Sequence, residues 1–235
     1  MDGRERIVAE LIVALDLPTG AEALRVVERV GDACGWYKVG SVLSVAEGPA
    51  IVRELVARGK RVFLDLKWHD IPNTVGGAVE QAATLGVSLA TLHLAGGPAM
   101  LRAAVQAAAG RLRLVGVGVL TSLDAPSYGE IVGRPVADVG AELVRLARMG
   151  IASGLDGVVT SPHEVRALRA ALGPSALLVV PGLRRSGEAA QDQVRSASPR
   201  DAAVAGADLL VVGRPVTSAA EPRAAVLAIL EEMAT

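Results

Sequence analysis

The architecture of this chain can be worked out from the segment Arg61-Val62-Phe63-Leu64-Asp65-Leu66-Lys67-Trp68-His69-Asp70-Ile71-Pro72-Asn73-Thr74. It begins with an apolar run of the kind found in buried strands. Pro72 then stands where a helix would begin, because proline is tolerated in the first turn of a helix. Two carboxylates and an ammonium group therefore fall where a strand ends and a helix starts.

The charges at this junction need partners. Residues two apart in a strand project to the same side, so we expect the side chains of Asp65 and Lys67 to be neighbours. Asp70 lies past the strand, where the strand period no longer places it. Because an unpaired buried charge is costly, the cluster is either a structural ion pair or a reaction centre, and the pattern alone leaves both open.

The same alternation of apolar runs and helical segments extends in both directions. Strands are expected at 11–15, 36–40, 62–66, 89–94, 112–120, 157–159, 177–180 and 209–212. Helices are expected at 21–30, from the second strand to about 59, and at 72–85, 100–109, 136–149, 162–172, 200–205 and 213–232, with a polar loop at 121–133. Runs rich in Val and Leu indicate strands buried on both faces of a parallel sheet.

An α/β fold of eight such units in 235 residues favours a single (β/α)8 TIM barrel. We therefore expect residues 1–235 to form one catalytic domain. The alternative is an open, doubly wound sheet, because the order of the strands in space cannot be seen in the sequence.

Composition excludes several classes of protein. The net charge is −1 and both signs are mixed along the chain, so the excess of positive charge that is typical of nucleic-acid-binding proteins is not seen. No uncharged run is long enough to span a membrane, and the apolar stretch 7–17 is interrupted by charges, unlike a signal peptide. Cys34 is the only cysteine, so no intrachain disulfide or cysteine metal cluster is expected. The three histidines lack the spacing of metal ligands, and His93 is the one that we expect to line an active site. We expect a soluble protein in a reducing, cytoplasmic setting, without a membrane partner.

Polar residues gather at the predicted strand ends, where barrel enzymes place their active sites. Lys38 is informative because it lies within an apolar strand, where lysine rarely lacks a partner. Neighbouring strands would bring it close to Asp65, in an alternating array of Lys38, Asp65, Lys67 and Asp70. The other members of the rim are Asp16, His93, Thr121, Ser122 and Arg214. Any one of these could instead be a cap or a satisfied core group.

A second polar group follows the last two predicted strands. Barrels often bind phosphate there, with backbone N–H groups at a helix start. Arg214 in a first helical turn opposes the helix dipole, and a bound anion would offset this. The long loop 181–195 could close as a lid or could be a solvated surface loop. The residues concerned are Gly182, Arg184, Gln193, Gly213 and Arg214.

These segments resemble the orotidine 5′-phosphate decarboxylase family. The ten residues 65–74 are similar to the family signature, and this is a highly specific match. Further similar pieces occur in family order over nearly the whole chain, whereas 185–191 carries no such similarity. They are Ala14-Leu15-Asp16, Lys38-Val39-Gly40, Leu120-Thr121-Ser122, Pro181-Gly182-Leu183-Arg184, Asp192-Gln193-Val194-Arg195 and Val212-Gly213-Arg214-Pro215.

The resemblance implies decarboxylation of orotidine 5′-phosphate to uridine 5′-phosphate and CO2, the last step of de novo uridylate synthesis, without metal or organic cofactor. It implies that Lys67 is the general acid that protonates C6 of the pyrimidine. Asp65 would lie against the departing carboxylate, and Lys38 would hold Asp65 and contact the ribose. Asp70 and Thr74 would enter the site from the other subunit, so a homodimer with shared active sites is implied.

The remaining substrate contacts are also implied by the resemblance alone. Asp16 would bind a ribose hydroxyl, Thr121 and Ser122 the base, and Gln193 both base and phosphate. Arg184, Gly213 and Arg214 would bind the phosphate, with Pro181 also among the substrate-binding residues.

Two other functions compete with this one. A Mg²⁺-dependent sugar-phosphate decarboxylase or aldolase-like synthase of the same barrel group shares the Asp-x-Lys-x-x-Asp core, but it carries an acidic residue where this chain has Lys38. A lysine ammonium and a metal ion at the same position would repel each other, so Lys38 disfavours the Mg²⁺-dependent alternative. A non-catalytic barrel that binds nucleotide phosphate would explain Arg214 and the loop, but not the alternating charges.

Overall fold

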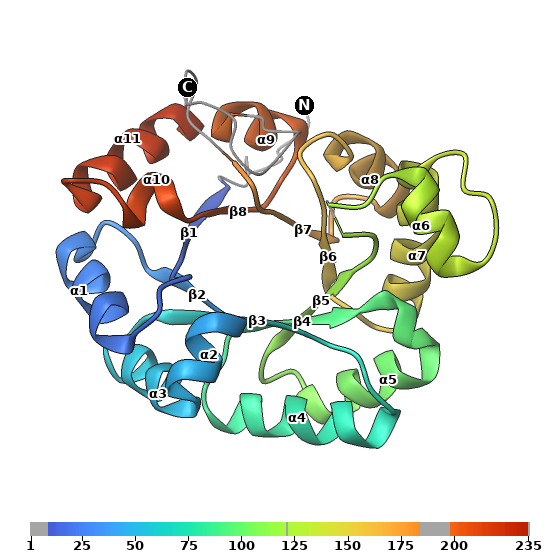
Figure 1. Ribbon diagram of the computed structural model, residues 1–235, viewed down its shortest axis with the longest axis horizontal. Coiled ribbons are helices and arrows are strands. Elements are labelled where there is room, and N and C mark those ends of the chain that lie inside the picture. The colour runs from blue at the N-terminus through green and yellow to red at the C-terminus, as the bar shows by residue number, and fades with distance from the viewer. Residues whose placement is uncertain (1–8, 121, 184–197, 235) are drawn as a thin grey trace, which may run out of the picture.

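The computed structural model describes residues 9–120, 122–183 and 198–234. Its parallel strands close into a barrel in the order β1-β2-β3-β4-β5-β6-β7-β8, surrounded by a ring of helices (Figure 1). The strands are β1 Glu10–Ala14, β2 Trp36–Gly40, β3 Arg61–Trp68, β4 Leu89–His93, β5 Arg113–Val117, β6 Gly157–Val159, β7 Leu177–Val180 and β8 Leu209–Val212. This confirms the single (β/α)8 barrel and excludes the open sheet.

The helices follow the strands in alternation. They are α1 Gly20–Val30, α2 Ser41–Glu47, α3 Pro49–Ala57, α4 Pro72–Thr84, α5 Gly97–Ala108, α6 Ala125–Val132, α7 Val139–Ala152, α8 Val165–Leu172, α9 Pro199–Ala205, α10 Arg214–Thr217 and α11 Pro222–Ala234, with a 3-10 turn η1 at Leu94–Gly96. No helix in the described part of the chain combines the length and the apolar character needed to cross a membrane.

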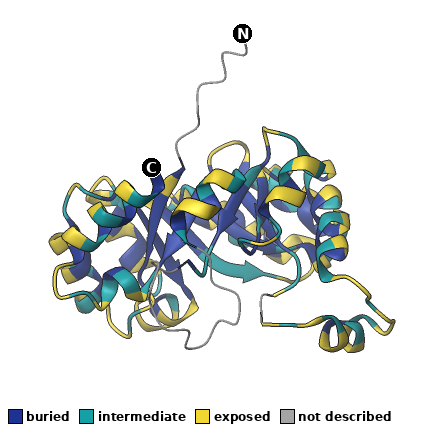
Figure 2. Ribbon diagram, turned by 90° about the horizontal axis from the view of Figure 1, so that it is seen from above, coloured by how far each residue is buried: buried dark blue, intermediate teal, exposed yellow. Residues whose placement is uncertain are grey.

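Closure depends on β1, which pairs with β2 on one side and with β8 on the other. The strands are buried along most of their length, and exposed residues lie on the outer faces of the helices and in the connecting loops (Figure 2). Helix α1 shows how the sequence directs this packing. Thr19 caps its first turn, Val26, Val27 and Val30 face the core, and Gly31 ends it with a φ of 64°.

Several of the expected helix and strand boundaries were wrong. The helix expected up to residue 59 is two helices, because Gly48 ends α2 at a φ of 58° and Pro49 opens α3. The helix expected at 213–232 is likewise divided into α10 and α11, and Pro222 opens the second. The fifth strand ends at Val117, and α6 lies inside the stretch expected to be a loop, with Asp124 as its N-cap.

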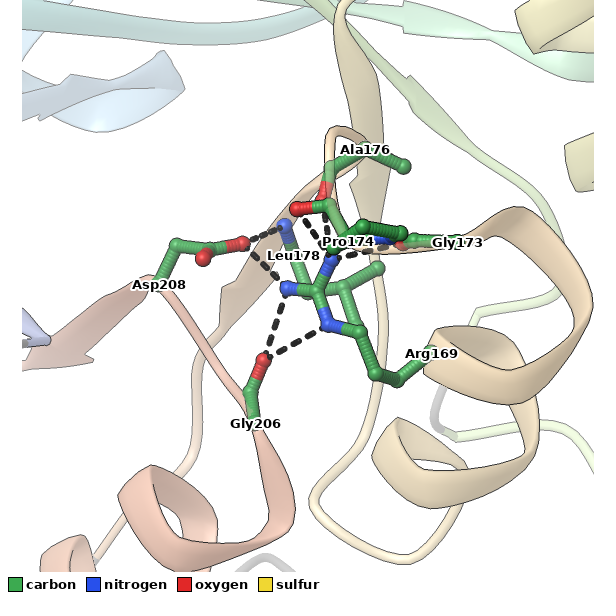
Figure 3. Close-up of polar contacts among 7 residues, drawn as sticks. All are labelled: Arg169, Gly173, Pro174, Ala176, Leu178, Gly206 and Asp208. Atoms are coloured by element: carbon green, nitrogen blue, oxygen red, sulfur yellow. Dashed lines mark hydrogen bonds and ion pairs between the residues drawn. The ribbon is translucent and has the colours of Figure 1, made fainter. Parts of the chain in front are cut away.

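Arg169 of α8 joins the segments that enter β7 and β8 (Figure 3). Its Nη2 donates to Asp208 Oδ2 at 2.6 Å and to the Gly206 carbonyl at 2.7 Å, and Nη1 donates to the Ala176 carbonyl at 2.7 Å. Asp208 Oδ2 also accepts from the Leu178 N–H at 2.6 Å. This guanidinium therefore ties together the amino ends of two strands, opposite the end where β7 and β8 lead into the expected phosphate region.

Arg169→Met is expected to lower the free energy of unfolding by about 3 kcal/mol, because it removes the charged partner of Asp208 and leaves several carbonyls without a donor. The methionine keeps much of the apolar stem. Arg166→Met on the exposed face of the same helix is the matched control. Urea unfolding of both variants checks this, and equal stability of the two would contradict it.

Candidate active site

Lys38 forms the centre of a charge cluster at the carboxyl ends of the first three strands. Its Nζ donates to Asp16 Oδ1 at 2.7 Å and lies 3.6 Å from Asp65 Oδ2. The residue is only 8% exposed, so the two carboxylates provide the partners that a buried ammonium requires. The expected proximity of Lys38 and Asp65 is confirmed, and Asp16 joins them as a direct partner of Lys38.

The register of the strands places this lysine. Ala14 of β1 pairs with Lys38, and Gly40 of β2 pairs with Asp65. Paired residues of parallel strands face the same side, and alternate residues share a face, so Lys38 and Asp65 both point into the barrel.

Lys67 extends the cluster, since its Nζ donates to Asp65 Oδ1 at 2.8 Å. The expected proximity is therefore confirmed, but a regular strand is not its cause. Leu64 pairs with Ala90 and Trp68 with Leu92, so β3 has three residues where β4 has one. Lys67 lies in this bulge with a φ of 51°, in the left-handed region that residues other than glycine seldom adopt.

Thr91 of β4 was missed by the sequence analysis. It is fully buried; its Oγ1 accepts from the Lys67 N–H at 2.8 Å and donates to Asp65 Oδ1 at 3.1 Å. The available signal was a lone hydroxyl in an apolar strand, two residues before His93 and therefore on the same face.

Asp70 and Thr74 lie apart from these charges. Both residues are exposed, and Asp70 Oδ1 accepts from the Ile71 N–H at 2.6 Å. Within the described residues Asp70 forms no ion pair, whereas Lys67 pairs with Asp65. The expected four-membered array is therefore wrong for a single chain: Asp16, Lys38, Asp65 and Lys67 form it, and Asp70 does not.

His93 lies at the end of β4, next to this cluster. Burial lowers the pKa of its imidazole, and the nearby charges of His69 and Lys67 lower it further. Its ring centroid lies 5.5 Å from that of His69, with the planes tilted by 44°. A neutral imidazole beside Lys67 adds no second positive charge to that part of the site.

The expected phosphate-binding residues that the structure describes lie at the ends of β7 and β8. Pro181 and Gly182 follow β7, and Gly182 has a φ of 78°. Gly213 is the N-cap of α10 and Arg214 is its first residue. Val13 of β1 pairs with Val212, so barrel closure brings this region beside the start of the Asp16 loop. Ser122 is exposed, and the expected sites Thr121, Arg184 and Gln193, with most of the loop 181–195, lie outside the described residues.

No three His, Cys, Asp or Glu side chains within the described ranges are grouped so that they could hold a metal ion. The position between Asp16 and Asp65 is taken by the Lys38 ammonium. The side chains that meet here can instead stabilise negative charge and donate a proton, through Lys67.

Comparison with known proteins identifies the family. The family model described as "Orotidine 5'-phosphate decarboxylase / HUMPS family" matches residues 9–229. A protein of Anaeromyxobacter dehalogenans named orotidine 5′-phosphate decarboxylase is 51% identical over 231 residues, which are 97% of this chain and 98% of the relative. A protein of the same name from Laribacter hongkongensis is 48% identical, over 94% of this chain and 92% of its own.

A solved structure has the same architecture. The crystal structure of orotidine 5′-phosphate decarboxylase from Lactobacillus acidophilus superimposes with a TM-score of 0.87 at 33% identity, covering 97% of this chain and 100% of that one. The sequence match, the shared barrel and the cluster of charges at the carboxyl ends of its strands all point to the same family. The chain belongs to the orotidine 5′-phosphate decarboxylase / HUMPS family.

Proposed function

We propose that this protein decarboxylates orotidine 5′-phosphate to uridine 5′-phosphate and CO2, completing de novo uridylate synthesis. The relatives that match nearly the whole chain carry this activity in their names. The observation that carries the proposal is the Asp16, Lys38, Asp65 and Lys67 cluster, with the Lys67 Nζ 2.8 Å from Asp65.

The chemistry of the cluster suits this reaction. Loss of CO2 leaves an electron pair at C6 of the pyrimidine, and a fixed ammonium beside that carbon stabilises the transition state. Lys67 is proposed to supply this charge and then the proton. Asp65 is proposed to lie against the departing carboxylate, so that their repulsion is relieved as CO2 leaves.

The other contacts are proposed from the family resemblance. Lys38 holds Asp65 and contacts the ribose, and Asp16 binds a ribose hydroxyl. The burial of Lys38 and its 2.7 Å bond to Asp16 support placing these two residues together at the ribose. Thr121 and Ser122 are assigned to the base and Gln193 to base and phosphate. The phosphate is assigned to Arg184, Gly213 and Arg214, with Pro181 nearby. Binding energy from this remote phosphate would position the base.

A homodimer is part of the proposal. Asp70 and Thr74 are proposed to reach the active site of the other subunit. Their exposure, and the lack of an ion pair for Asp70 among the described residues, support a role outside their own chain's cluster. No cofactor is proposed, because Lys67 supplies both the charge and the proton. A cytoplasmic location is proposed on the composition and the buried, unpaired Cys34.

The test is a decarboxylation assay with the purified full chain. Orotidine 5′-phosphate is expected to lose absorbance in the pyrimidine band as uridine 5′-phosphate forms, with and without EDTA. Activity abolished by EDTA would favour the Mg²⁺-dependent sugar-phosphate enzymes instead. Nucleotide binding without turnover would favour a non-catalytic barrel.

Gly40→Ala is expected to slow this reaction about tenfold to a hundredfold, because small displacements of catalytic groups are costly. A Cβ at Gly40 would lie 2.6 Å from Asp16 Oδ1 and 2.9 Å from Lys38 Nζ, and would force the pair apart. Gly35→Ala, just before the other end of β2, is the control, since its Cβ would approach only Arg61, at 3.9 Å. Steady-state kinetics of both variants check this, and wild-type activity of Gly40→Ala would contradict it.

A further inference from the structure

The Thr91 hydroxyl has no role in the reaction proposed above, although it lies at the centre of the site. It comes from β4, whereas both groups that it contacts belong to β3. Its oxygen accepts from the Lys67 N–H at 2.8 Å and donates to Asp65 Oδ1 at 3.1 Å. The side chain is completely buried, so water cannot readily replace either bond.

The bulge in β3 explains why a side chain is needed at this point. Residues 65–67 lie opposite Thr91 alone, because Leu64 pairs with Ala90 and Trp68 with Leu92. The regular ladder of backbone bonds is interrupted there, and the Lys67 N–H donates to the Thr91 side chain instead. Lys67 is also held at a φ of 51°, a conformation that is unfavourable for residues other than glycine and persists only where its surroundings hold it.

The number of protons on the Thr91 hydroxyl fixes the direction of its hydrogen bonds. A hydroxyl has one proton to give, and an ionised carboxylate can only accept. Because the Lys67 N–H occupies a lone pair of Oγ1, the hydroxyl proton is directed at Asp65 Oδ1. The same Oδ1 accepts from Lys67 Nζ at 2.8 Å. One threonine oxygen thus links the backbone from which the lysine extends to the carboxylate that its ammonium contacts.

We propose that Thr91 is a positioning residue for decarboxylation, whose hydroxyl couples the left-handed Lys67 backbone to the Asp65 carboxylate and so holds ammonium and carboxylate in their reactive geometry. The inference rests on the proposed function, because this geometry affects a rate only if Lys67 and Asp65 face the reacting carbon. The phosphate and ribose are assigned to other residues. Loss of the hydroxyl should therefore lower kcat and leave KM nearly unchanged.

Thr91→Val tests this with an isosteric change that suits a strand. We expect kcat to fall about 30-fold with KM within about threefold, and Thr91→Ser, which keeps the hydroxyl, to stay within about threefold of wild type. Ser153→Ala is the control, because it removes another buried hydroxyl, one that donates to the Met149 carbonyl at 2.8 Å outside the site. The proposal is overturned if Thr91→Val keeps wild-type kcat, if only KM rises, or if Thr91→Ser is as slow as Thr91→Val.

A second measurement does not depend on the reaction. Hydrogen exchange of the Lys67 amide should be slow in wild type and Thr91→Ser, and about tenfold faster in Thr91→Val. If wild type converts no orotidine 5′-phosphate, the proposed function fails, while unchanged exchange in Thr91→Val separately overturns the role of Thr91.

Thr91→Cys replaces Thr91→Val if the latter does not fold. A thiol is a weaker donor than a hydroxyl, so its kcat and amide exchange should lie between those of the serine variant and those expected for valine. Wild-type values for both in the cysteine variant would overturn the proposal.

Discussion

Lys67→Ala is expected to lower kcat/KM for orotidine 5′-phosphate by at least about 10⁴-fold, because it removes the group proposed to donate the proton and to place a positive charge beside the developing negative charge. The barrel should remain folded. The Lys67 side chain is 36% exposed, and Asp65 keeps Lys38 at 3.6 Å and Thr91 at 3.1 Å. Alanine also keeps a Cβ at the left-handed position, so the backbone preference of the bulge is unchanged.

The measurement is steady-state decarboxylation together with thermal unfolding of each variant. Lys60→Ala is the control, since Lys60 lies just before β3, at its other end, and its Nζ donates to the Gly31 and Cys34 carbonyls at 2.7 and 3.1 Å. It should keep nearly full activity. Substantial turnover by folded Lys67→Ala would refute the role of Lys67.

Lys67→Arg separates the two contributions of the lysine. Arginine keeps a positive charge but does not give up a proton in proteins. The variant should stay nearly inactive if proton donation is essential. Recovery of most of the activity would mean that the charge alone is sufficient.

Mixing Lys67→Ala with Asp70→Ala subunits is expected to restore about a quarter of wild-type activity, although each variant alone is nearly inactive. With free exchange about half of the dimers are mixed, and each mixed dimer has one site that receives an intact Lys67 from one subunit and an intact Asp70 from the other. The expectation follows from the proposed shared site. It is supported by the exposed position of Asp70 past the end of β3, outside its own chain's ion pairs.

A matched control comes from the structure. Asp65 and Lys67 belong to the same cluster of one chain, with Nζ 2.8 Å from Oδ1. Mixing Lys67→Ala with Asp65→Ala subunits therefore leaves no site intact and should restore nothing. Exchange is verified with differently tagged subunits. If the Lys67 and Asp70 variants fail to complement after verified exchange, the shared site is wrong.

Parts of the active site could be predicted from local patterns. Lys38 within an apolar strand required a carboxylate, and the next strand along the chain offered Asp65; the structure places them 3.6 Å apart. The bond between Asp65 and Lys67 was also expected, but for the wrong reason. A regular strand was expected there, whereas Asp65 and Lys67 lie in a bulge of β3, which no hydrophobic period reveals.

Other features depended on residues that are distant in the sequence. Thr91 lies 24 residues from Lys67 and 26 from Asp65, so no spacing rule connected it with either. The division of the expected helices at Gly48 and Pro222 was readable in principle, because glycine and proline mark such ends.

Burial period and turn chemistry are local properties of the chain, so they were enough to predict that eight buried strands alternate with helices and that Asp16, Lys38, Asp65 and Lys67 lie in or just after strands. The folded barrel was needed to find that β1 closes on β8, that Asp16 pairs with Lys38, and that the Lys67 N–H in the β3 bulge donates to Thr91. These features arise from contacts between separate strands, whose order and register are set when the barrel closes.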